Sequence, residues 1–141
     1  MLCKKAYNCI LNVSYVNARI MAVRLSAAKF NITIINAYAP TEDAEDRDKD
    51  EFYQALTQCL HSLPGHDIKI ILGDFNAKVG REDIWRGTIG THSSHDVNND
   101  NGERLTQWAA LEDLVITGTI FPRKERGFLQ TEEQRIKLTM C

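Results

Sequence analysis

Apolar side chains occupy both alternating faces of two short segments near the amino-terminal end of the chain, residues 18–25 and residues 30–38. A short, mostly apolar run of this kind predicts a β-strand in each segment. The turn between them is short enough for a hairpin. Because strands that are apolar on both faces are usually central in a sheet, we expect the second strand to be covered on both sides. Asn12 is interpreted as part of a further, ordinary strand that ends before Asn17.

Pro40 ends the second strand, and a segment with apolar residues along one helix face follows. The apolar positions recur at the spacing of one helix face and predict a helix over about residues 46–62, stopped by Pro64 and Gly65: Phe52, Leu56, Cys59, Leu60 and Leu63. Residues 42–51 contain seven acids and two bases. Acidic side chains interact favourably with the amino-terminal end of a helix, so we interpret this run as the solvated helix start rather than as a metal cluster.

The second half of the chain predicts a buried strand at residues 68–72, a long polar loop at 77–99, a helix at 102–111 and a strand at 114–117. Asp100 and Glu103 have the spacing of a capping box at the start of that helix. The inner face of the helix is predicted to consist of Leu105, Trp108 and Ala109.

This order of elements predicts an α/β (α+β) layered domain. The tail, residues 125–141, is charged and fits neither the helical nor the strand period well. We therefore expect the domain to occupy residues 1–124 and the divergent tail to lie outside its fold.

The composition is that of a globular domain, and the net charge bears on whether nucleic acid can be a partner. The chain has 141 residues, 43% hydrophobic and 26% charged, and a formal net charge of -2. A negative chain has no global field that attracts nucleic acid, so such a partner would have to be held locally. No apolar run is long enough for a membrane helix. The spacing of the four cysteines fits no zinc pattern, and without an export signal we expect an intracellular protein.

The strongest candidate chemistry follows the 68–72 strand as Gly73-Asp74-Phe75-Asn76. Asp74 and Asn76 are two residues apart and point the same way in an extended chain, so a carboxylate and an amide can converge on one substrate atom. The alternative is a simple turn, because Gly, Asp and Asn all favour turns. Tyr38, at the end of another strand, can contact a phosphoryl oxygen or be an ordinary half-buried tyrosine. His92 and His95 are interpreted as exposed loop residues.

Together, the segments Asn36-Ala37-Tyr38-Ala39-Pro40-Thr41 and Gly73-Asp74-Phe75-Asn76 resemble the endonuclease/exonuclease/phosphatase superfamily, the DNase I-like phosphodiesterases. Further blocks resemble the endonuclease domains of its non-LTR retrotransposon branch, and they lie in residues 17–20, 52–53, 76–80, 99–105 and 114–122. The resemblance covers about residues 17–124, with the blocks in the family's order.

The resemblance implies a partial DNase I-like four-layer α/β sandwich and a magnesium-dependent hydrolysis of DNA, with a nuclear location. By the same resemblance, Tyr38 would contact the phosphate, Asp74 would orient or deprotonate the attacking water, and Asn76 would hold Asp74 and the scissile phosphate. Mg²⁺ would neutralise charge on the phosphoryl and leaving oxygens.

The chain departs from the family pattern at both ends. The family's opening Asn and its metal-binding Glu precede the tyrosine by many tens of residues, whereas 37 residues precede Tyr38 and residues 8–13 lie too near it. The late Asp and the late His are also missing, since neither residue type follows residue 113. We therefore expect a chain truncated at both ends, with its metal ligands unknown, that does not cleave DNA alone and that self-associates through exposed sheet edges. The alternatives are a non-catalytic remnant or binding module on this scaffold and, less directly, a lipid or nucleotide phosphatase.

Overall fold

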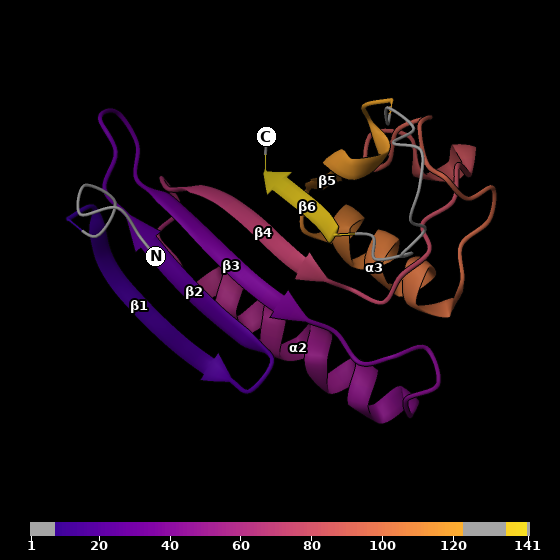
Figure 1. Ribbon diagram of the computed structural model, residues 1–141, viewed down its shortest axis with the longest axis horizontal. Helices are drawn as coiled ribbons and strands as arrows, with labels where there is room; N and C mark the ends of the chain where they lie inside the picture. The colour runs from indigo at the N-terminus through magenta and orange to yellow at the C-terminus, as the bar shows by residue number, and fades with distance from the viewer. Residues whose placement is uncertain (1–7, 123–134, 141) are drawn as a thin grey trace, which may run out of the picture.

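The computed structural model describes residues 8–122 and the backbone of residues 135–140. These residues form a six-stranded mixed sheet with two helices (Figure 1). The strands, in their order across the sheet, are β1 (Ile10–Asn17), β2 (Ile20–Leu25), β3 (Ile32–Tyr38), β4 (Ile68–Asp74), β6 (Arg135–Met140) and β5 (Leu114–Ile116). The helices are α2 (Asp46–Ser62) and α3 (Asp100–Leu111).

The length of the segment between two strands decides whether they pair antiparallel or parallel. β1, β2 and β3 are antiparallel neighbours joined by short turns, which confirms the predicted hairpin of β2 and β3. β3 and β4 are parallel, with α2 in the crossover between them. A parallel pair needs such a crossover because the chain must return to the starting end of the sheet. The crossover brings the carboxyl ends of β3 and β4 to the same edge.

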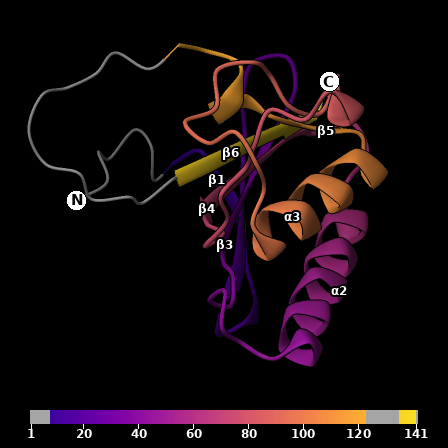
Figure 2. The same ribbon diagram turned by 90° about the vertical axis from the view of Figure 1, so that its right-hand side faces the viewer.

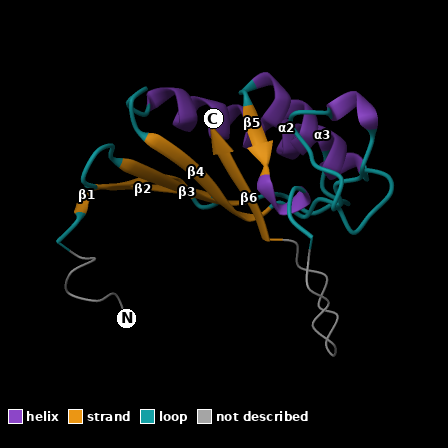
Figure 3. Cartoon of the chain, turned by 90° about the horizontal axis from the view of Figure 1, so that it is seen from above, coloured by secondary structure: helices purple, strands orange, loops and turns teal. Residues whose placement is uncertain are grey.

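Both helices lie on one face of the sheet, where the core forms (Figures 2 and 3). Ile35 and Ile71 are paired neighbours in β3 and β4, and both are completely buried. Leu56 of α2 and Leu105 of α3 are also completely buried in this core. The predicted inner face of the second helix is confirmed, because Leu105, Trp108 and Ala109 are all buried. The fold is thus the predicted α/β class.

The start of α3 differs from the capping box expected at Asp100. The N-cap is Asn99, whose side-chain oxygen accepts a hydrogen bond from the Gly102 amide at 2.8 Å. Asp100 is instead the first helical residue, and its carboxylate accepts hydrogen bonds from Lys49 at 2.9 Å and from Arg104 at 3.0 Å. The spacing identified the helix start to within one residue, but the choice between two adjacent capping side chains depended on these long-range partners.

The face of β1–β4 opposite the helices, here called the open face, is almost entirely apolar. The strand registers place ten hydrophobic side chains on it: Val13, Tyr15, Met21, Val23, Leu25, Ile32, Ile34, Ile68, Ile70 and Leu72. None of these ten side chains is in the buried class. The expectation that β3 is covered on both sides is therefore wrong for the described residues, which place helices on one face only.

Because apolar surface of this extent favours association, we expect the purified chain to form oligomers. Val13→Lys and Ile68→Lys put a charge on the open face at positions that are 39% and 42% exposed. Each is expected to shift the chain toward monomer in sedimentation velocity measured over a range of concentrations. Leu111→Lys is the control, since Leu111 is 83% exposed at the end of α3, away from the open face. An unmodified chain that stays a monodisperse monomer over this range would contradict the prediction.

The tail contributes a strand that the sequence pattern did not indicate. β6 pairs antiparallel with β4 on one side and with β5 on the other, so it lies inside the sheet. Residues 135–140 of the tail are thus a strand of this sheet, whereas the expectation that residues 125–141 lie outside the family fold stays a prediction. Alternation is present in the segment Arg135-Ile136-Lys137-Leu138-Thr139-Met140, but the charged residues before it obscure so short a signal.

Candidate functional site

Tyr38 and Asp74 are brought together by the parallel register of β3 and β4. The two residues are direct partners across the strands, and each is the last residue of its strand. Adjacent strands lie about 4.8 Å apart and partner side chains share a face. Tyr38 is half exposed and Asp74 is partly buried, so a solute can approach both.

A local turn then fixes Asn76 against Asp74. The Asn76 amide donates a hydrogen bond to Oδ1 of Asp74 at 2.9 Å, which is the geometry of an Asx turn. Asn76 has a φ of 48°, a left-handed conformation that asparagine tolerates better than most residues. Its side-chain Nδ2 donates to the carbonyl of Ala39 at 2.9 Å. The motif therefore forms the turn that its residue types favour, and this turn holds Asn76 next to Asp74. That these side chains act together on one substrate atom stays a prediction.

Gly73 permits the close approach of the two strands just before the site. A Cβ atom built at Gly73 would lie 1.8 Å from the carbonyl oxygen of Ala37, its partner in β3. Its φ of +147° is also unfavourable for other residues. Phe75, between the two polar residues, is completely buried and packs edge-on against Phe52 of α2, with 6.3 Å between ring centroids.

Asn101, at the start of α3, connects the two loops that carry the site. Its Nδ2 donates hydrogen bonds to the carbonyls of Pro40 and Asn76, both at 3.1 Å, and the side chain is buried. The loop after β3 and the loop after β4 are therefore attached to the same helix end. The sequence placed Asn101 in a resembling block but gave it no role, and no local pattern distinguishes it from its polar neighbours.

Glu42 also attaches the loop after β3 to the start of α3. Its carboxylate accepts hydrogen bonds from the backbone amides of Asp100 and Asn101 at 3.0 and 3.1 Å. A carboxylate is stabilised there by the unpaired amides and the dipole of the helix. The buried Lys49 ammonium links the Glu42 carbonyl, at 2.7 Å, to Asp100. Much of the acidic run thus serves as a polar contact between α2 and α3, while α2 begins at Asp46 as predicted.

Arg19, in the turn between β1 and β2, is a site neighbour that the sequence did not indicate. Its guanidinium carbon lies 5.4 Å from the centroid of the Tyr38 ring, a cation–π arrangement. The Tyr38 amide donates to the Arg19 carbonyl at 2.9 Å, and Arg19 Nη1 donates to the Tyr38 carbonyl at 3.4 Å. A cation, a phenol and a carboxylate therefore lie side by side along one sheet edge.

The described residues do not provide a fitting set of magnesium ligands at this edge. Mg²⁺ prefers several oxygen ligands in near-octahedral geometry. Residues 8–122 contain no group of three or more His, Cys, Asp or Glu side chains that could hold a metal ion. Asp74 is the one carboxylate among the predicted site residues, and one of its oxygens already accepts from the Asn76 amide. His92 is exposed, as expected, and His95 is partly buried.

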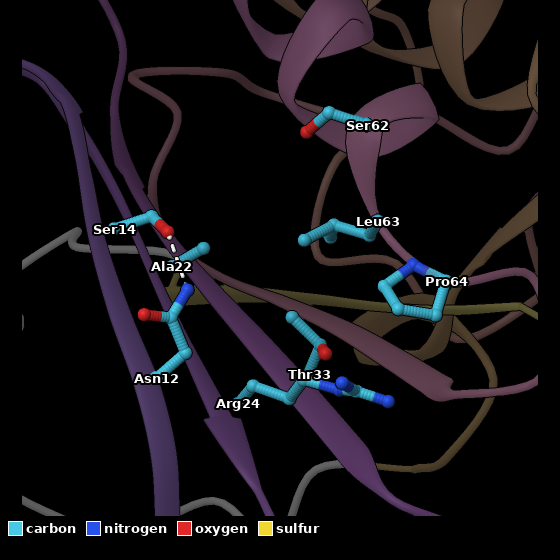
Figure 4. Close-up of a pocket in the computed structure, with 8 residues that line it drawn as sticks. All are labelled: Asn12, Ser14, Ala22, Arg24, Thr33, Ser62, Leu63 and Pro64. Atoms are coloured by element: carbon cyan, nitrogen blue, oxygen red, sulfur yellow. Dashed lines mark hydrogen bonds between the residues drawn. The ribbon is translucent and has the colours of Figure 1, made fainter.

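A pocket of about 370 Å³ lies at the opposite end of the sheet from the site, beside the end of α2 (Figure 4). Two of the polar side chains that line it, Arg24 and Thr33, already donate hydrogen bonds to a third residue, Asp67. Arg24 donates two hydrogen bonds to the buried Asp67 carboxylate, at 2.7 and 2.9 Å, and Thr33 donates a third at 2.8 Å. The Arg24 hydrogen bonds hold the pKa of Asp67 below its ordinary value. We interpret this group as structural.

Two curated proteins are similar to this chain in sequence. It is 37% identical to craniofacial development protein 2 of Bos taurus and 34% identical to that of Tragulus javanicus, each over 123 residues. These matches cover 87% of this chain, but the chain spans only about a fifth of the length of either relative. No family model matches the sequence.

The endonuclease domain of TRAS1, a telomere-specific non-LTR retrotransposon, has a similar structure, with a TM-score of 0.53 at 15% identity. The similarity covers 85% of this chain and 48% of that domain. An endonuclease/exonuclease/phosphatase family protein from Leptotrichia buccalis aligns with a TM-score of 0.47 at 11% identity. The first of these similarities shows that the fold is DNase I-like, as the sequence predicted. Among the described residues, no helix has the length and apolar character needed to cross a membrane.

Proposed function

We propose that this chain supplies one part of the active site of a magnesium-dependent DNA endonuclease of retrotransposon type. The proposal starts from its DNase I-like fold and from its similarity to part of craniofacial development protein 2. In this proposal Tyr38 binds the scissile phosphate, Asp74 orients the attacking water, and Asn76 holds Asp74. We expect no DNA cleavage by the chain alone, since residues 8–122 contain no group of three or more His, Cys, Asp or Glu side chains that could hold a metal ion.

The observation that supports this assignment is the convergence of the three residues at one edge. Tyr38 and Asp74 end adjacent parallel strands, and the Asn76 amide binds the Asp74 carboxylate. Ligands of open α/β sheets bind outside the carboxyl ends of the strands. A water that donates to the free oxygen of Asp74 would lie beside a phosphate contacted by the Tyr38 hydroxyl. Holding the water next to the phosphate in this way would supply the proximity that attack on a phosphodiester requires.

A non-catalytic binding module on the same scaffold is the second candidate. It is favoured by one observation, that residues 8–122 contain no group of three or more His, Cys, Asp or Glu side chains that could hold a metal ion. Such a module would still bind DNA or another phosphate-containing ligand at the Tyr38 edge, without breaking a bond.

A chimera distinguishes the two candidates. Residues 8–122 would replace the matching segment of the TRAS1 endonuclease domain, with the rest of that domain retained. We expect the chimera to nick plasmid DNA with Mg²⁺, and the same chimera with Asp74→Ala to lose at least about 10²-fold of that activity. Circular dichroism would establish that both are folded. A folded chimera without Mg²⁺-dependent nicking would favour the binding module and contradict the endonuclease assignment.

A further inference from the structure

Arg19 is held in a fixed place beside Tyr38. The backbone bond from the Tyr38 amide to the Arg19 carbonyl, 2.9 Å long, continues the pairing of β2 with β3 by one residue. The guanidinium carbon then lies over the Tyr38 ring at 5.4 Å from its centroid, and Nη1 reaches the Tyr38 carbonyl. The side chain is therefore positioned from both its backbone and its head group, although it is exposed.

Arg19 also differs from the other described arginines in its charge balance. Each of the others has a carboxylate partner: Arg24 with Asp67, Arg47 with Glu51, Arg81 with Asp96, Arg86 with Asp83, and Arg104 with Asp46. Within the described part of the chain, Arg19 forms no ion pair, and its Nε and Nη2 groups have no hydrogen-bond partner. Its positive charge is thus available to a ligand.

Two acidic side chains lie near Arg19 without neutralising it. Asp48 and Glu51 line a pocket of about 370 Å³ together with Arg19. Both carboxylates pair with Arg47 instead, at 3.7 and 3.9 Å. Arg19 therefore has no carboxylate partner among the described residues.

We infer that Arg19 is a phosphate-binding residue of the proposed site and that it holds a phosphodiester oxygen of DNA next to Tyr38. The inference rests on the proposed function and adds a contact to it. A guanidinium presents its N–H groups in a planar fork that matches two phosphate oxygens. The Tyr38 ring keeps this fork at the edge, so less side-chain freedom is lost when a phosphate binds. A chain with a net charge of -2 needs such a local contact, because its overall field does not attract DNA.

The test is fluorescence anisotropy of a short fluorescein-labelled DNA duplex with the full chain, at several salt concentrations and without divalent ions. Arg19→Ala is expected to weaken binding by about tenfold, the effect of losing one charge-assisted hydrogen-bonded contact. It should also reduce the slope of log Kobs against log salt by about 0.9, because one phosphate contact is lost. Arg19→Lys should restore the slope but not the full affinity, since it keeps the charge and lacks the fork.

Arg86→Ala is the matched control, because it makes the same change in net charge at an exposed arginine that Asp83 already neutralises. It is expected to leave affinity and slope unchanged. Equal losses in Arg19→Ala and Arg86→Ala, an unchanged Arg19→Ala, or no binding by the unmodified chain would each overturn the inference. The proposed function is tested separately, since it fails when the folded chimera does not cut DNA, whatever the duplex binding shows.

Discussion

Supercoiled plasmid incubated with Mg²⁺ and the chain alone is expected to remain uncut, at the level of a sample without protein. The physical reason is electrostatic: charge that develops on the phosphate in the transition state needs a held cation and positioned donors. Loss of one oxyanion donor typically costs ~10²–10³ in rate. Tyr38, Asp74 and Asn76 are the predicted site residues, and residues 8–122 contain no group of three or more His, Cys, Asp or Glu side chains that could hold a metal ion. We therefore expect several such contributions to be missing together.

Agarose gels that separate supercoiled from nicked plasmid measure this outcome. Asp74→Ala is the control for contamination, because nicking by a contaminating nuclease would persist in it. Nicking by the unmodified chain that disappears in Asp74→Ala would contradict the prediction. A second copy of the chain, brought together through the open face, would then be the first source of ligands to test.

Gly73→Ala is expected to destabilise the fold severely, by roughly 2–6 kcal/mol in the free energy of unfolding. Overpacking typically costs about 1–3 kcal/mol and an unfavourable backbone conformation costs about 1–3 kcal/mol more. Both apply here, because the new Cβ would lie 1.8 Å from the Ala37 carbonyl oxygen and the φ of Gly73 is +147°. The atom in the way is backbone in the adjacent strand, so it cannot move without separating β3 from β4.

Urea denaturation followed by circular dichroism would measure the loss. Gly65→Ala is the matched control, because a Cβ at Gly65 meets no atom within 4 Å. Its effect should stay within about 0.5 kcal/mol. Similar midpoints for the two variants would show that β3 and β4 can separate at this position without cost.

The sequence by itself determined the α/β class, the order of most elements and the two strand ends that carry the predicted site residues. Short apolar runs and helical stripes are local signals. For this reason the predicted bounds of the strands β2, β3 and β4 and of the helices α2 and α3 lie close to the observed ones. Polar residues at the ends of two parallel strands meet because α2 returns the chain to the same end of the sheet. Tyr38 and Asp74 are grouped by the resemblance to the DNase I-like family, and the parallel pairing of their strands was added by the structure. Their catalytic roles stay predictions.

Only the tertiary structure decided which polar residues hold that edge in place. Arg19, Glu42 and Asn101 act through partners that lie 19 to 61 residues away in the chain. No local period encodes such contacts, because each depends on how the strands and helices pack against one another. The same reason explains β6, whose pairing with β4 and β5 needs the rest of the sheet, and the Asn99 cap of α3. Side-chain type and spacing give the elements, whereas long-range packing selects which of their polar groups meet.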